Sequence, residues 1–145
     1  MAKQLINIGS AANDGTGDTL RDGADKVNDN FNEIYNLAGN LTLSALGSGS
    51  SFSLDFSAAT TFTATANAAA TFTFSNAVQG QVIDLILTGN FAITFSETGS
   101  TFNKVGSTDY DGTANNLIQI VCTDDSSGAK IYHYSIATYT SDTTP

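Results

Sequence analysis

Two glycines precede a predicted helix in the segment NDGTGDTLR, residues 13–21, an arrangement from which phosphate-binding turns are built. A helix N-terminus offers free backbone N–H groups and the positive end of its dipole to an anion. The lysine of a GxxxxGK[ST] loop is absent here, and Asp14 and Asp18 would repel a phosphate. We therefore expect a structural turn and no nucleotide or cofactor site.

A second oxygen-rich segment is STDYDGTANN, residues 107–116, where Asp109, Asp111 and either Asn115 or Asn116 lie near Gly112. Carboxylate and amide oxygens suit calcium, which makes a calcium loop one interpretation. The segment lacks the spacing of an EF-hand and the bidentate glutamate at its end. An ordinary polar loop is the simpler interpretation, and we predict no metal site.

Catalytic chemistry has two further candidates. Cys122 and His133 fall on the strands of a predicted hairpin, but a cysteine nucleophile also needs an oxyanion donor set, which the sequence does not reveal. Asp55, Asp84 and Glu97 are scattered over different strands without the local pattern of a glycoside hydrolase. We expect a buried thiol, a strand histidine, no catalytic residue and no enzyme activity. A single cysteine also excludes an intrachain disulfide.

The glycine-rich turn leads into a helix with a regular apolar seam. Small and apolar residues recur in steps of four and three, at Leu20, Ala24, Val27, Phe31, Ile34 and Ala38. This is the heptad spacing of a helix that packs along another helix. Gly23 and four asparagines weaken the helix, so it needs a partner surface. The seam either covers the β-region of its own chain or contacts other chains. Thr19 or Asp18 is the expected N-cap, and Gly39 with Asn40 the expected stop.

The first quarter of the chain resembles the N-terminal module of a class of tailed-bacteriophage virion proteins. That class includes a trimeric baseplate wedge protein of T-even-like phages, which lies close to the short tail fibres. The matching positions are Ile6 to Gly9, Asn13 to Asp18, Leu20, Arg21, Lys26, Asn28, Asn30, Phe31, Glu33 and Tyr35, with Ile34 in place of the usual leucine. The resemblance implies attachment to a virion. With the seam, it defines a predicted docking and oligomer interface of Ile6, Ile8, Gly15, Gly17, Leu20, Arg21, Val27, Phe31, Ile34 and Tyr35.

The rest of the chain alternates apolar and polar residues with a period of two. Phe52, Leu54 and Phe56 alternate with Ser and Asp, and Phe62 to Ala66, Phe72 to Phe74 and Phe91 to Phe95 repeat the pattern. The segments 81–89, 117–123 and 130–138 predict three more strands. We predict a mainly β protein of two parts, in which residues 1–40 form a docking arm, turn and helix. Residues 41–145 form an antiparallel β-sandwich or barrel-like domain.

The charge balance excludes one class of partner. The chain carries a net charge of -9 with only five basic residues, so it lacks the basic stripe that neutralises phosphates, and we expect no nucleic-acid binding. No apolar run has the length of a membrane span, and the start MAKQLINIG lacks the apolar core of a secretory signal. We therefore expect no membrane partner, and synthesis and assembly in the host cytoplasm.

These observations favour a structural protein of a phage particle, a homotrimeric adaptor or short fibre component of the tail or baseplate. A capsid decoration protein, bound to the major capsid protein, is the first alternative. A receptor- or carbohydrate-binding module is the second, with Tyr110, Tyr132, Tyr134 and Tyr139 as stacking faces, although the chain has no tryptophan. Copy number per virion separates a tail component from a decoration protein.

Overall fold

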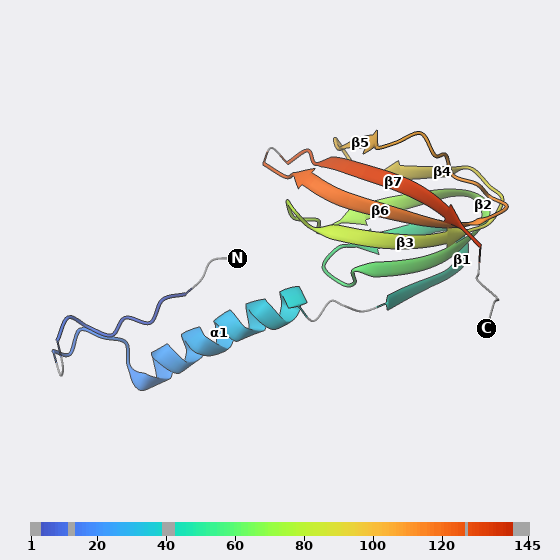
Figure 1. The fold of residues 1–145 in the computed structure, drawn as a ribbon. Coiled ribbons are helices and arrows are strands. Elements are labelled where there is room, and N and C mark those ends of the chain that lie inside the picture. The colour runs from blue at the N-terminus through green and yellow to red at the C-terminus, as the bar shows by residue number, and fades with distance from the viewer. Residues whose placement is uncertain (1–3, 12–13, 39–42, 127, 141–145) are drawn as a thin grey trace. The chain divides into compact units, whose positions relative to one another are not determined.

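The computed structural model describes residues 4–11, 14–38, 43–126 and 128–140. Contacts divide the chain into two compact units, Met1–Asn40 and Leu41–Pro145, and each is described by itself. The first unit contains an extended arm and helix α1, and the described residues of the second form seven strands (Figure 1). Within the described ranges, no helix is long and apolar enough to cross a membrane.

Helix α1 spans Leu20–Ala38 and begins at a reciprocal cap. The backbone N–H of Asp22 donates to Thr19 Oγ1 at 3.1 Å, and the Thr19 hydroxyl donates to Asp22 Oδ2 at 2.7 Å. The cap satisfies a free N–H of the first turn and places negative charge at the positive end of the dipole. The predicted helix start is confirmed, with Thr19 as the cap. The predicted stop, Gly39 with Asn40, lies outside the described residues.

The second unit is one sheet that curls over its own core. The strands are β1 Leu43–Asp55, β2 Thr61–Ser75, β3 Val82–Thr88, β4 Ile93–Ser96, β5 Thr101–Lys104, β6 Asn115–Asp124 and β7 Ile131–Tyr139. Their order in the sheet is β1-β2-β3-β6-β7-β5, and β4 pairs with β2. The mainly β class with a helix in the N-terminal part is therefore confirmed.

The predicted antiparallel arrangement is wrong for most of the sheet, which is mixed. In the described part of the chain β1·β2, β2·β3, β2·β4 and β5·β7 are parallel, and β3·β6 and β6·β7 are antiparallel. The reason is that β2 curls: its first half pairs with β3 and its second half with β4. From β1 to β4 the chain thus winds so that β2 runs parallel to β1, and β3 and β4 run parallel to β2 (Figure 1). Residues 62–66 and 72–74 belong to one curved strand.

Winding stacks the phenylalanines of successive coils. Phe52 of β1 and Phe72 of β2 stack with ring centroids 4.8 Å apart, and Phe95 of β4 meets Phe72 edge-on at 6.1 Å. Phe74 then contacts Tyr132 of β7 at 5.0 Å across the core. Aromatic pairs in such geometries add about 0.5–1.5 kcal/mol each beyond their buried area. The repeated pattern of phenylalanines therefore forms the interior of the curled sheet.

Candidate docking site

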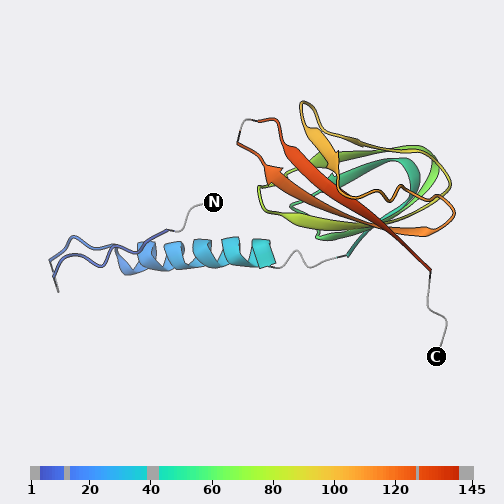
Figure 2. The same cartoon turned by 45° about the horizontal axis from the view of Figure 1, so that its top comes forward.

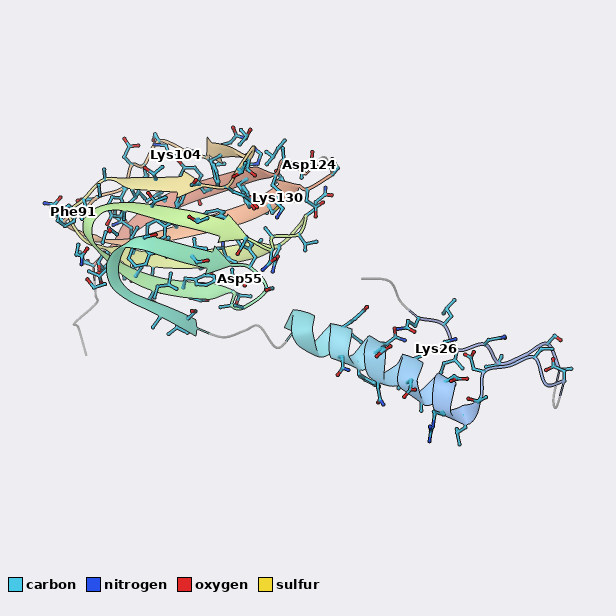
Figure 3. The ribbon with its side chains drawn as sticks, turned by 180° about the vertical axis from the view of Figure 1, so that it is seen from behind. Lys26, Asp55, Phe91, Lys104, Asp124 and Lys130 are labelled. Atoms are coloured by element: carbon cyan, nitrogen blue, oxygen red, sulfur yellow. The ribbon has the colours of Figure 1, made fainter. Side chains whose placement is uncertain are left out.

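The arm folds back along helix α1 (Figure 2), and polar side chains of the helix hold it there. The Asn30 side chain accepts from the Gln4 backbone N–H and donates to the Gln4 carbonyl, both at 2.9 Å, as a neighbouring strand would. Lys26 points toward the arm, where its ammonium donates to the Leu5 carbonyl at 3.2 Å (Figure 3). The Gln4 side chain donates to Asp29 at 2.8 Å. Side chains of the helix thus fix the arm through the backbone groups of the arm.

Asp18 and Asn7 join the arm to the segment that leads into the helix. The Asn7 N–H donates to Asp18 Oδ2 at 2.8 Å, and the Asp18 N–H donates to the Asn7 carbonyl at 2.7 Å. The Lys26 ammonium lies 2.6 Å from the same Asp18 oxygen, and its hydrogen bond to that oxygen, with the Asn7 N–H, lowers the Asp18 pKa. Gly17 permits this close pairing, since a Cβ there would lie 2.9 Å from the Asn7 carbonyl oxygen.

Asp14 closes the turn between the two segments. Its carboxylate accepts hydrogen bonds from the backbone N–H groups of Ser10, Ala11 and Thr16 at 2.6–2.9 Å, and from the Ser10 hydroxyl at 2.8 Å. Hydrogen bonds from the Thr16 and Ala11 backbone, followed by that of Ser10, hold the Asp14 pKa far below its usual range. The carboxylate occupies the place that a phosphate takes in an anion-binding turn, which supports the expected structural turn.

The apolar residues of this unit stay largely exposed while its polar groups bond to one another. Ile8 is 88% exposed, Leu20 92%, Phe31 54% and Ile34 58%. Gly23 is the least exposed of the helix positions whose burial is described, and it lies beneath the arm, since a Cβ there would lie 3.5 Å from Ile6 Cγ2. A shallow groove runs between arm and helix, lined by Ile6, Ile8, Gly17, Leu20, Gly23, Ala24 and Val27 among others. This unit is the candidate docking site.

The structure brings together most of the predicted interface. Ile6, Ile8, Gly17, Leu20 and Val27 line the groove, and the exposed Phe31 and Ile34 follow on the same helix. Arg21 is exposed on the first turn of the helix, and Gly15 lies at the turn with a φ of +70°. The side chain of Tyr35 and all of Asn13 lie outside the described part of the structure.

Sequence reasoning omitted the polar residues that hold the unit together. Asn7, Asp14, Asp18, Lys26 and Asn30 make the hydrogen bonds between arm, turn and helix. All five were within the motif, at fixed spacing with charge or amide chemistry, so the signal was present. Fixed spacing identifies these residues as a family motif, whereas their contacts depend on how the arm folds onto the helix.

The oxygen-rich loop at 107–116 uses its side chains internally. Asp109 forms an ion pair with Lys104, and the Asp111 carboxylate accepts from the Thr113 N–H at 2.9 Å and its hydroxyl at 2.7 Å. The fully buried Asn116 donates to the Asp111 and Ala114 carbonyls at 2.7 and 3.1 Å. Among the described residues, no cluster of three His, Cys, Asp or Glu side chains could hold a metal ion.

The candidate catalytic groups are held apart. Cys122 pairs in register with Tyr132 and points into the core, and burial raises its thiol pKa. His133 pairs with Val121 on the opposite face of the sheet, and its Nδ1 lies 3.0 Å from the Thr123 hydroxyl. Alternate residues of a strand point to opposite faces, so the thiol and the imidazole cannot form a catalytic pair.

The three scattered carboxylates have separate local partners. Asp55 accepts from Ser57 and Asn76 at 2.7–2.9 Å, and Asp84 from Gln119 at 3.3 Å. Burial by itself would raise the pKa of Glu97, but hydrogen bonds from Tyr132, Ser100 and Lys130 outweigh it and lower the pKa. The Glu97 contact also fixes Tyr132, whose hydroxyl donates at 2.6 Å.

The four tyrosines considered for sugar stacking do not form one surface. Tyr132 is fully buried, which removes it as a stacking face. Tyr110 and Tyr134 line a hollow between β4, β5 and β7, and the Tyr110 hydroxyl donates to the Gly89 carbonyl at 2.6 Å. Tyr139 lines a different hollow beside Gly89 and Gly112.

The chain thus joins an arm that carries the motif and a helix with exposed apolar residues to a mainly β domain. The chain belongs to the family described as bacteriophage T4 gp9/10-like protein, N-terminal, whose model matches residues 3–140. The predicted resemblance is confirmed, and the match extends well beyond the first quarter of the chain. No solved structure matches the chain.

Two baseplate proteins of one phage are similar to part of this chain. The chain is 61% identical over 33 residues to the baseplate wedge protein gp10 of Enterobacteria phage T4, which covers 23% of this chain and 6% of the relative. It is 44% identical over 48 residues to the baseplate protein gp9 of the same phage, and this match covers 33% of the chain and 17% of gp9. The chain therefore spans only a small part of these relatives.

Proposed function

We propose that this protein is a non-enzymatic structural component of a bacteriophage tail or baseplate, a homotrimeric adaptor or short fibre component that docks through residues 1–40. Its partners are two further copies of itself and other virion proteins. It works in the virion after assembly in the host cytoplasm. The names of the two relatives, both baseplate proteins of phage T4, support the tail over the capsid and over a carbohydrate-binding module.

This proposal rests on the different roles of the polar and the apolar residues in the N-terminal unit. Polar residues of the family motif, such as Lys26 and Asn30, bond the arm to the helix. The apolar residues, among them Ile8 and Phe31, stay exposed. In this small unit the polar groups bond to one another, and the apolar side chains remain exposed to solvent. Such an exposed apolar surface is suited to burial against other chains.

Helix α1 is the part that we assign to trimer formation. Val27, Phe31 and Ile34 follow the spacing of four and three that places successive side chains along one seam. Each is more than one-third exposed in the single chain, so each has apolar surface to bury. Asn28, Asn30 and Asn32 are poor helix formers, and packing against two other helices would compensate for them.

The test replaces one seam residue. Phe31→Asp places a charge in a threefold contact, so the mass measured by light scattering should fall from that of three chains to that of one, and incorporation into particles should be lost. Val105→Asp is the matched control, because Val105 is equally exposed, at 54%, but lies in the β-domain. It should keep the trimer. A wild-type chain that stays monomeric at high concentration would contradict the proposal.

A further inference from the structure

Strand β4 has one edge that no described strand covers. It pairs with β2 alone, and the loop between β5 and β6 makes no backbone hydrogen bond to it in the described structure. The Ala70 N–H donates to the Ala92 carbonyl at 2.9 Å, so the backbone of Ala92 faces β2. Successive residues of a strand turn their backbone groups to opposite edges, and those of Ile93 and Phe95 therefore face away from β2. Such an unpaired row is a template for a further strand.

The core of the β-domain is incompletely covered beside this edge. Six partly buried apolar side chains among the described residues pack against the core, and five of them line a single hollow: Ile93, Phe95, Phe102, Tyr110 and Tyr134. The hollow has a volume of about 340 Å³. The rings of Phe95 and Tyr134 meet edge-on at 5.0 Å, so β4 and β7 are in contact through their aromatic side chains. The apolar interior is therefore partly open to solvent along β4.

Hydrogen bonds fix the segments that border this hollow. The turn from β4 to β5 is anchored by Glu97, whose carboxylate accepts from the Tyr132 hydroxyl at 2.6 Å. The loop after β5 is anchored by the Tyr110 hydroxyl, which donates to the Gly89 carbonyl at 2.6 Å. A site that is formed before its ligand arrives loses less conformational entropy on binding. The hollow is thus a preformed site.

The free edges of β1 and β5 carry features that oppose strand pairing. Two register shifts against β2 interrupt β1, one between Ala45 and Ser48 and one between Gly49 and Ser51. Irregularities of this kind bend an edge away from a partner strand. Strand β5 ends in Lys104, and lysines at a sheet edge also oppose pairing. Strand β4, Ile-Thr-Phe-Ser, contains no charge, proline or glycine, so its edge is the best suited to accept a strand.

The lining of the hollow indicates which segment fits. Isoleucine and phenylalanine side chains from three strands surround it, so it suits apolar side chains. The stretches of this chain outside the described ranges are short, and none has apolar side chains at alternate positions. A second copy that offered its own β4 edge would create a twofold axis, which the trimer proposed above does not have. The occupant is therefore a segment of a different protein.

We propose that the free edge of β4 accepts an extended segment of another virion protein, with aliphatic or aromatic side chains at alternate positions. Backbone hydrogen bonds to Ile93 and Phe95 hold the segment, and its apolar side chains fill the hollow. The assignment of the partner to the virion rests on the function proposed above, whereas strand addition itself does not. Because β4 has four residues, the contact is short and adds to the attachment through residues 1–40.

The experiment measures binding of a fluorescent peptide, acetyl-KTVTFTVK-amide, to the full chain by anisotropy. The control peptide has the same sequence with every backbone nitrogen methylated, which removes the N–H groups that a strand donates. It should bind about tenfold more weakly. NMR should show slower hydrogen exchange of the Ile93 and Phe95 amides when the unmodified peptide is bound.

A matched pair of variants separates the backbone from the side chain. Ile93→Pro removes the outward N–H and leaves the pairing with β2 intact, so it should weaken binding about tenfold. Ile93→Ala shortens the same side chain but keeps the N–H, so it should weaken binding less. Circular dichroism checks that both variants fold.

Tight binding of the unmodified peptide, with protection of the β4 amides, supports the proposal. Equal affinity for both peptides would show that the hollow takes side chains without strand addition, and no binding at about 1 mM peptide would exclude the site. Protection along β1 would place the added strand elsewhere. Amides of β4 that are already protected in the chain alone, in a concentration-dependent manner, would show that a second copy is the occupant. Each of these results overturns the proposal and leaves the docking role of residues 1–40 untouched.

Discussion

A carboxylate that accepts three backbone hydrogen bonds and one hydroxyl within a single turn holds that turn more firmly than any neutral side chain. Asp14 does this with Ser10, Ala11 and Thr16. Each donor would otherwise point at water or at a bound anion. The Asp14 carboxylate thus accepts the hydrogen bonds that a bound phosphate would accept, and the turn needs no external anion.

The first prediction concerns acid. Because hydrogen bonding lowers the Asp14 pKa in the folded state, its stabilising effect is complete above the ordinary carboxyl pKa of 3.8 and is lost as the pH falls through the lower folded value. The amide NMR signals of Ser10, Ala11 and Thr16 should therefore stay constant from about pH 5 to 8 and move only well below about pH 4. Asp14→Ala should release them at every pH. A transition between pH 5 and 7 would contradict this account.

A second prediction separates the two glycines of the motif, which share a sequence pattern but meet different constraints. Gly15 has a φ of +70° with nothing near its missing Cβ, whereas a Cβ on Gly17 would lie 2.9 Å from the Asn7 carbonyl oxygen. Gly15→Val should cost about 1–2 kcal/mol of local strain. Gly17→Val should push the arm away from the helix entry.

Limited proteolysis checks this difference. The arm of Gly17→Val should be cleaved faster than the arm of Gly15→Val, and Gly17→Val should be incorporated less into particles. Gly15→Ala and Gly17→Ala are the smaller matched pair, and circular dichroism of the β-domain should be unchanged in all four variants. A Gly15 variant that releases the arm more than its Gly17 partner would show that the turn and not the close approach is limiting.

At the scale of elements, the helix could be predicted because its information is local. The cap at Thr19 and the seam residues Leu20, Val27 and Phe31 lie within about three and a half turns of one another. Gly23 is the instructive exception. Its residue type argues against a helix, and yet it lies within α1, beneath the arm, where a Cβ would make an ordinary contact with Ile6 Cγ2 at 3.5 Å. The contact of the arm with this position was not visible in the sequence pattern.

Strand positions could be predicted but strand directions could not. Alternation identifies β2 and β3, yet it is the same whether a strand continues straight or curls, and here the curl of β2 sets the parallel pairing. Residues 101–104, Thr-Phe-Asn-Lys, have no clear alternation, and β5 forms there because β7 offers its edge. Such pairing depends on contacts far apart in the chain, which no local pattern encodes.

The β6–β7 hairpin carries the third prediction. Cys122 and His133 lie on opposite faces of it, so substitution should affect packing and nothing else. Cys122→Ala should lower the free energy of unfolding by about 0.5–3 kcal/mol, and the partly exposed His133→Gln by less. Chemical denaturation measures both, and trimer mass and infectivity should not change. Loss of a hydrolytic activity in either variant would contradict a purely structural role.

At the scale of the whole molecule, the two units differ in how they are stabilised. The β-domain has a continuous core of buried aromatic and aliphatic side chains, including Phe72, Leu85 and Ile120. In the described part of the N-terminal unit, Leu5, Ile8, Leu20 and Phe31 are each more than half exposed. The first unit therefore depends on assembly, whereas the second has the contents of an independent domain.

This difference leads to the last prediction, on a truncated chain that starts at Asn40. All of the described strands lie beyond that point, so the truncated protein should remain soluble and rich in β-structure. It should fail to join the particle, because the motif and the exposed seam have been removed. It should also be monomeric by light scattering, because helix α1, to which we assign trimer formation, has been removed. Normal incorporation of this chain into virions would place attachment in the β-domain and overturn the role assigned to residues 1–40.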